Sequence, residues 1–179
     1  MTDFTYYTIE TAPEEAKPIL TQINQGYGYI PNLFAYMAEA PTTLEAYLAL
    51  NALIEKTSLT PGQQQVALLA VSVQNKCEFC TVAHRAIGKM KQANQQTLDA
   101  VNTGAVIDNA QDAALVDFVQ SVVESRGRPG DAAIEAFLNG GFTKQQIFEV
   151  MLVVSIKTLS NYINHLTLPE PNAELLSMI

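Results

Sequence analysis

The 179-residue chain has no tryptophan, only two cysteines and two histidines, and 10 basic residues against 18 acidic ones. The net charge of -8, with no basic cluster, argues against binding to nucleic-acid phosphates or to an anionic membrane surface. Glycine and proline are not in excess, and apolar residues make up 48% of the chain. This composition is typical of a folded protein with a substantial core and excludes a disordered chain.

Long hydrophobic runs are also missing. The most apolar stretch, 147–156, contains Glu149 and spans only ten residues, whereas a bilayer-spanning helix needs about twenty. The first residues show neither the basic start nor the apolar run of a secretory signal. We therefore expect a soluble, cytoplasmic protein. In that compartment two cysteines are more often catalytic or metal-binding than joined in a permanent disulfide.

Helical spacing of apolar residues recurs along the chain, and no segment shows the two-residue alternation of a half-buried strand. The length and this pattern predict an all-α fold in a single domain over residues 1–179. After the last long helix, Pro169 and Pro171 lead into a tail. The expected helices cover approximately residues 13–26, 32–39, 41–56, 82–91, 94–102, 111–126, 131–138 and 143–166. One more helix is expected to start at Pro61 and to include Val73.

Two segments, 60–73 and 143–156, resemble each other weakly at an offset of 83 residues. Both start with Thr-x-x-Gln, the sequence of a helix capping box, and both continue into an apolar run. The pattern indicates either an internal duplication or two buried helices with similar starts. The cysteines that follow the first copy have no counterpart after the second, where Ser160 and Ile163 stand.

The clearest chemistry lies in Cys77, Cys80 and His84. On a helix, Cys80 would lie about 60° and His84 about 20° from Cys77, so all three would project from one stripe. Cys80 and His84 are four residues apart and can touch. An ordinary thiol is only about 3% thiolate at pH 7, and a neighbouring imidazole and a helix N-terminus would both raise that fraction. A second cysteine can convert a sulfenic acid into a disulfide, so the motif predicts redox catalysis.

Two other interpretations of this segment stay open. A structural zinc site needs four ligands, and the segment offers three, with His165 as the only other histidine. Two buried cysteines beside a core histidine would need no chemistry at all.

The pattern Cys-x-x-Cys-x-x-x-His after a capped apolar helix resembles the alkylhydroperoxidase AhpD-like branch of the carboxymuconolactone decarboxylase superfamily, and within it the peroxidase-related proteins. The resemblance implies an all-α AhpD-like bundle with a core of about 28–166 and peroxide reduction by the cysteine pair. It also implies recycling by a dithiol or thioredoxin-like reductant and assembly into trimers or hexamers. We expect a homo-oligomer (dimer, trimer or hexamer) with no cofactor and no metal. Supporting segments are Ile30–Phe34, Ala40-Pro41, Ser72 and Asn161-Tyr162-x-Asn164.

Carried onto this chain, the resemblance implies that Cys80 is the peroxidatic thiol, Cys77 the resolving thiol and His84 the group that moves the proton. The order of a thioredoxin-like motif would instead favour Cys77 as the attacking thiol. Where the family often has a glutamate that orients and recharges the histidine, this chain has Gln65, whose amide cannot carry a proton. Glu78 could substitute for it in a proton relay, unless its side chain faces solvent.

Two alternative functions follow from the same residues. One is a lyase similar to carboxymuconolactone decarboxylase, a reaction that does not need the cysteine pair. The other is a non-enzymatic, redox-sensing helical module whose disulfide changes its assembly.

Overall fold

The computed structural model describes residues 3–179, which form ten helices and no strand. This confirms the prediction of an all-α fold. The helices are α1 (Lys17–Tyr27), α2 (Asn32–Met37), α3 (Pro41–Ile54), α4 (Pro61–Gln74), α5 (Glu78–Met90), α6 (Gln95–Thr103), α7 (Ala110–Glu124), α8 (Gly130–Asn139), α9 (Lys144–Thr167) and α10 (Ala173–Leu176).

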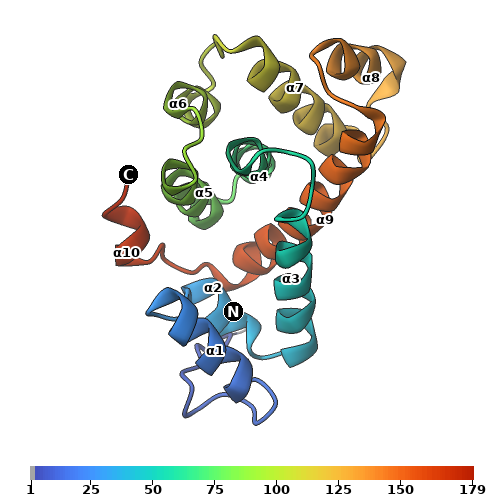
Figure 1. The fold of residues 1–179 in the computed structure, drawn as a ribbon. Helices are drawn as coiled ribbons and strands as arrows, with labels where there is room; N and C mark the ends of the chain where they lie inside the picture. The colour runs from blue at the N-terminus through green and yellow to red at the C-terminus, as the bar shows by residue number, and fades with distance from the viewer. Residues whose placement is uncertain (1–2) are drawn as a thin grey trace.

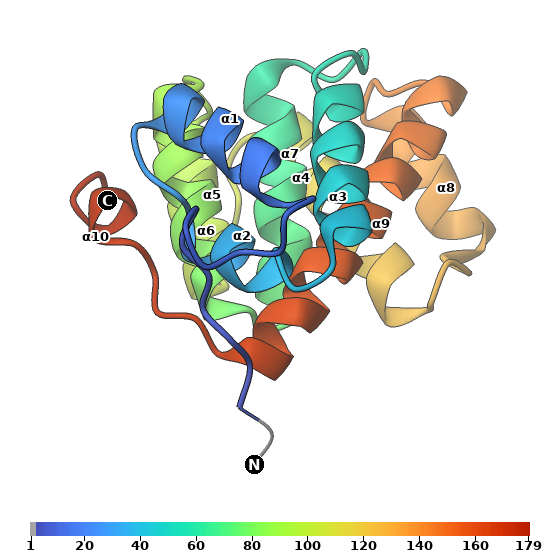
Figure 2. The same cartoon turned by 90° about the horizontal axis from the view of Figure 1, so that it is seen from below.

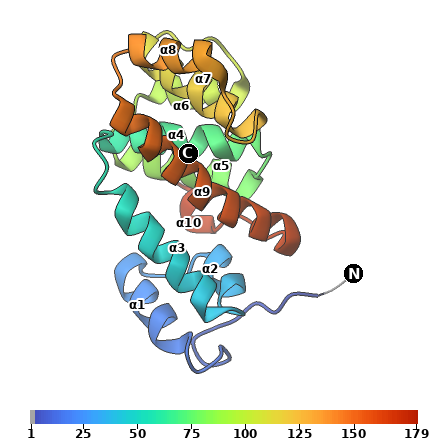
Figure 3. The same cartoon turned by 90° about the vertical axis from the view of Figure 1, so that its right-hand side faces the viewer.

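The long helix α9 organises the molecule, because it runs diagonally across it (Figure 1). Figure 3 shows α1, α2 and α3 on one side of α9 and the helices from α4 to α8 on the other. Helix α4 lies deepest in the second group, where it packs against α5, α6, α7 and α9. Nine of its 14 residues are buried, as expected for a helix that is covered on most sides. Helix α4 therefore forms the centre of the core.

Both predicted capping boxes are present and start the two central helices. At the start of α4, the Gln63 amide donates to Thr60 Oγ1 at 3.2 Å and the Thr60 amide donates to Gln63 Oε1 at 3.0 Å. Thr143 and Gln146 make the same reciprocal pair at the start of α9, at 3.3 and 2.8 Å. The two segments diverge at their ends, because α4 has 14 residues and stops before the cysteines, whereas α9 has 24 and continues past the corresponding point.

Two helix starts differ from the prediction. Helix α5 begins at Glu78 and not near Val82, because Cys77 takes the N-cap position. Helix α1 begins at Lys17, because the turn after Pro13 first closes through a three-residue bond from the Ala16 amide to the Pro13 carbonyl, at 2.9 Å.

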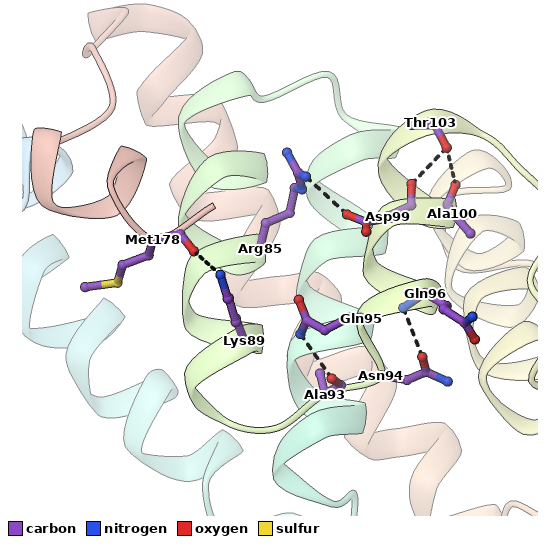
Figure 4. A network of polar contacts seen from close by, with 10 residues as sticks. All are labelled: Arg85, Lys89, Ala93, Asn94, Gln95, Gln96, Asp99, Ala100, Thr103 and Met178. Carbon is purple, nitrogen blue, oxygen red and sulfur yellow. Dashed lines mark hydrogen bonds and ion pairs between the residues drawn. The ribbon is translucent and has the colours of Figure 1, made fainter.

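The expected tail after Pro171 contains the short helix α10, which lies beside α5 (Figure 2). Asn172 accepts from the Asn32 amide at 2.9 Å and donates to Asn32 Oδ1 at 3.2 Å. Lys89 Nζ on α5 donates to the Met178 carbonyl at 3.0 Å (Figure 4). A four-residue helix has little stability alone, so these long-range contacts hold the segment in place.

Within residues 3–179, no helix combines the length and the apolar character needed to cross a bilayer.

Candidate functional site

The turn between α4 and α5 places the first cysteine. Lys76 has a φ of 57°, and the Cys77 amide reaches back to the Ser72 carbonyl at 2.9 Å, as in the Schellman motif that ends many helices. Cys77 is then the N-cap of α5, with extended backbone. The single helical stripe expected from the spacing therefore holds for Cys80 and His84, whereas Cys77 precedes the helix.

The two thiols lie together in the core. Both cysteines are free, and Cys77 and Cys80 are only 2% and 1% exposed. The Asn164 carboxamide of α9 donates from Nδ2 to Cys80 Sγ at 3.2 Å and to Cys77 Sγ at 3.6 Å. The Cys77 thiol also hydrogen-bonds to Cys80. Thus Asn164 of α9 and Cys77, the residue before α5, both donate to the Cys80 sulfur.

The two thiols differ in acidity: the pKa of Cys80 is lowered and the pKa of Cys77 is raised. The hydrogen bond from Cys77 and the positive charge of Lys157 hold the pKa of Cys80 well below its ordinary range, although burial alone would raise it. The same hydrogen bond, together with burial, strongly raises the pKa of Cys77. Cys80 also occupies the third residue of α5, where the helix dipole favours an anion. The site is therefore organised for a Cys80 thiolate beside a protonated Cys77.

Lys157 of α9 is a site residue that the sequence motif did not indicate. It is 1% exposed, and none of the ion pairs in the described part of the chain includes it. Burial lowers the pKa of Lys157, but the facing Cys80 thiolate and Tyr47 outweigh this effect and the net pKa is raised. A buried ammonium needs a compensating anion, and the Cys80 thiolate supplies it.

One sequence signal could have revealed this lysine. The buried side of α9 includes Val150, Val153, Ser160 and Asn164, and their alternating three- and four-residue spacing continues through position 157. A single lysine on an otherwise buried helical stripe indicates a charge that is retained for a partner in the core.

His84 contacts Gln65, the residue at the position where the family often has glutamate. His84 Nδ1 lies 3.0 Å from Gln65 Oε1, and both side chains are buried. Burial, and secondarily the charge of Lys157, lowers the pKa of His84 well below its usual value. The imidazole is therefore neutral at pH 7. With the carbonyl oxygen of Gln65 as acceptor, Nδ1 carries the hydrogen and Nε2 remains available as a base.

Glu78 and His165 do not join this group. Glu78 is exposed, and no described hydrogen bond connects it to His84. Its side chain therefore faces solvent, which was the alternative to a role in the proton relay. His165 is exposed and stacks on Tyr162 with a ring separation of 6.1 Å. Between residues 3 and 179, no cluster of three histidine, cysteine or acidic side chains is arranged to hold a metal ion.

Helices α3 and α9 cover the sulfurs. Tyr47 of α3 is buried, and its hydroxyl contacts Ser160 and faces Lys157; burial is the main reason that its pKa is raised. Asn161 of α9 is fully buried, and its Oδ1 accepts from Asn75 Nδ2 at 3.0 Å. Two shallow surface hollows lie elsewhere, between the outer face of α5 and either the C-terminal segment or α6.

Comparison with known proteins connects this site to a protein class. Residues 41–124, which include α4 and the complete cysteine motif, match the model of the Carboxymuconolactone decarboxylase family. This match covers a little under half of the chain, and the fold of the chain as a whole is AhpD-like. No curated protein is significantly similar to it in sequence.

Solved structures agree with this assignment of the fold. An alkylhydroperoxidase AhpD core, an uncharacterized peroxidase-related protein from Ralstonia eutropha JMP134, has a TM-score of 0.83 and 24% identity, covering 98% of this chain and 94% of its own. A peroxidase-related protein from Silicibacter sp. TM1040 has a TM-score of 0.79 and 23% identity, covering 97% and 92%. A variant of the debrominase Bmp8 in complex with 2,3,4-tribromopyrrole has a TM-score of 0.79 and 17% identity, covering 99% and 96%.

Proposed function

We propose that this protein is a thiol-dependent peroxidase that reduces hydrogen peroxide or organic hydroperoxides. The observation that carries the proposal is the pair of adjacent buried thiols that share the Asn164 donor, with the buried Lys157 lowering the pKa of Cys80. The thiolate is the nucleophilic form of cysteine, and a resolving thiol lies beside it. The names of the two peroxidase-related neighbours agree with this proposal.

The proposed reaction has two steps. The Cys80 thiolate attacks one peroxide oxygen, the O–O bond breaks, and the departing alkoxide or hydroxide takes a proton from Lys157. Cys80 is then a sulfenic acid. Cys77 loses its proton and attacks the Cys80 sulfur, the S–O bond breaks, and the oxygen leaves as water, which leaves a disulfide. A dithiol or thioredoxin-like reductant then reduces the disulfide and is itself oxidised, and the restored Cys80 thiol returns a proton to Lys157.

His84 and Gln65 are proposed to manage protons in the second step. The raised pKa of Cys77 means that its attack needs a base. Neutral His84 can accept that proton at Nε2 while Gln65 keeps the ring oriented through Nδ1. The exposure of Glu78 argues against a role for it in this relay.

Access and assembly complete the proposal. Both sulfurs are buried, so peroxide and reductant reach them only when covering side chains move. We propose a cytoplasmic location, supported by the two free thiols. We also propose a homo-oligomer in which α9 packs against a second copy. Its outer face carries exposed Phe148, Tyr162 and Leu166.

The proposal is tested by measuring hydrogen peroxide consumption with dithiothreitol as reductant. We expect turnover in the native chain, none in Cys80→Ser, and a single oxidation without turnover in Cys77→Ser. Consumption by Cys80→Ser at the native rate would contradict the proposal. If oxidation changes the particle mass in light scattering without any turnover, the redox-sensing alternative holds. A lyase reaction has less support, because decarboxylation of a lactone does not require the thiolate–ammonium pair.

A further inference from the structure

Two carboxamides on α9 each leave one polar atom without a partner beside the Cys80 sulfur. Asn161 and Asn164 are 0% and 3% exposed, and they lie three residues apart on the same helix. In the part of the chain that the structure describes, Asn161 Nδ2 lacks an acceptor and Asn164 Oδ1 lacks a donor. One unpartnered donor and one unpartnered acceptor therefore lie within the core at the reacting sulfur.

In each asparagine, the carboxamide atom that does have a partner fixes the orientation of the side chain. Asn164 donates from Nδ2 to both sulfurs, and reversing its amide would place the carbonyl oxygen against the Cys80 thiolate. Asn161 Oδ1 accepts from Asn75 Nδ2 at 3.0 Å. The Asn161 amide also faces Cys80 closely enough to favour its thiolate, although Nδ2 makes no hydrogen bond of normal geometry. Contacts to the sulfurs and to Asn75 therefore hold the unpartnered atoms in place.

Unpartnered polar atoms in a core are costly, and native proteins keep few of them without a functional reason. A ligand that satisfies this pair must both accept and donate hydrogen bonds within a short length. A carboxylate only accepts and would leave Asn164 Oδ1 unpaired, and an apolar group would satisfy neither atom. A hydroperoxide group has an O–H donor next to oxygen acceptors and matches both.

We infer that Asn161 and Asn164 form a peroxide subsite that holds the O–O bond against Cys80 Sγ, and that this subsite selects hydrogen peroxide over bulky organic hydroperoxides. The inference deepens the proposed function and rests on it. The peroxide O–H donates to Asn164 Oδ1, and a peroxide oxygen accepts from Asn161 Nδ2. The preference for a small substrate follows from the surroundings, because Tyr47 and Lys157, which lie near Cys80, are both buried. The two asparagines are positioning residues, since the nucleophile is the sulfur.

The experiment compares two reactions of the same thiolate in Cys77→Ser, so that only Cys80 reacts. Its oxidation by hydrogen peroxide and its alkylation by iodoacetamide are both followed by mass spectrometry at the same pH. Alkylation requires the thiolate and access to it but does not use a peroxide subsite. The ratio of the two rates therefore cancels changes in pKa, in burial and in the folded fraction.

We expect Asn161→Leu to lower the oxidation-to-alkylation ratio by about a hundred- to a thousandfold, the range for loss of one positioned hydrogen-bond donor. Asn161→Ser, which restores a donor, should recover part of the ratio. Asn164→Asp keeps an acceptor at the same place and should retain more of the ratio than Asn164→Leu. The control is Thr158→Val on the same helix, whose hydroxyl donates to the Val154 carbonyl at 2.8 Å; its ratio should not change.

A parallel fall of both rates in Asn161→Leu would overturn the subsite, because the residue would then act through the thiolate or the fold. Equal or faster oxidation by cumene hydroperoxide than by hydrogen peroxide would overturn the size selection. A failure of the proposed function would give a different result in the Cys77→Ser protein itself. Iodoacetamide would alkylate Cys80, but hydrogen peroxide would not oxidise it.

Discussion

Lys157 of α9 is buried near Cys80 at the N-terminus of α5, where its positive charge lowers the pKa of that thiol and the Cys80 thiolate raises the pKa of the lysine. The residues are far apart in sequence and come together because α9 packs against α4 beside the start of α5. Each charge offsets the cost of burying the other. The pair explains how a lysine with 1% exposure is tolerated in the core, and it gives Cys80 its nucleophilic form.

Removing the lysine charge should make Cys80 a weaker acid. Because the pKa of Cys80 is lowered, its alkylation by iodoacetamide should persist well below pH 8.5 and decline only as the pH falls through that lowered pKa. In Lys157→Met the decline should move to higher pH by about 1–3 units, the usual effect of losing a close opposite charge. The control is Lys144→Met at the exposed start of the same helix. Identical profiles for both variants would show that Lys157 does not act on the thiol.

Trapping the sulfenic acid with dimedone should assign the two cysteines. In Cys77→Ser, exposure to peroxide should place the adduct on Cys80, because its sulfur carries the lowered pKa. In Cys80→Ser, Cys77 should react slowly, because burial still raises its pKa after the interaction with Cys80 is lost. Peptide mass spectrometry locates the adduct. An adduct that forms only on Cys77 would reverse the proposed roles.

Gln65→Glu should alter the pH profile of peroxidase turnover. A carboxylate 3.0 Å from His84 Nδ1 would stabilise the imidazolium and so raise the pKa of His84 from its present low value. The acidic limb that reports protonation of His84 should then move to higher pH. Gln64→Glu, at the neighbouring position of α4, is a buried control whose side chain contacts Thr57 and Leu59. An unchanged profile in Gln65→Glu would place residue 65 outside the proton relay.

The outer face of α9 should control assembly. Phe148, Leu152, Ser155, Leu159, Tyr162 and Leu166 follow one another at spacings of four and three residues. This is the repeat of a helix-packing seam, and the side chains of Phe148 and Leu166 are 75% and 65% exposed. Phe148→Glu should lower the mass measured by light scattering to that of one chain. Val106→Glu, at an apolar residue that is 86% exposed in a loop, is the control. A native mass in Phe148→Glu would exclude this face as the interface.

The two capping boxes should contribute similarly to stability. Thr60→Ala and Thr143→Ala each remove a side-chain acceptor for a helix amide, at 3.2 and 3.3 Å, and each should lower the free energy of unfolding by about 1 kcal/mol. Chemical denaturation measures the loss. Thr42→Ala serves as a control, because Thr42 is exposed and its hydroxyl makes none of the described hydrogen bonds. If both variants lower the free energy of unfolding no more than Thr42→Ala does, water replaces the hydrogen bonds of the two caps.

Much of the fold was predictable because its signals are local. The Thr-x-x-Gln sequences marked the starts of α4 and α9, and the caps formed as expected. The spacing of Cys80 and His84 placed both on α5. The start of α5 was predicted four residues too late. Cys77 takes the N-cap position after a turn in which Lys76 adopts a left-handed conformation. A lysine in the sequence does not indicate such a turn.

The sequence by itself determined the helical class and the reactive segment 77–84, because apolar periodicity, caps and motif spacing act over one or two helical turns. Only the tertiary structure decided that Lys157, Asn161 and Asn164 surround the sulfurs, that Glu78 faces solvent, and that residues 173–176 form a helix against α5. These outcomes depend on how α9 and the C-terminal segment pack against helices about 80 residues away in the chain. Burial at that contact creates the low-dielectric environment in which a single ammonium can set the charge of a thiol.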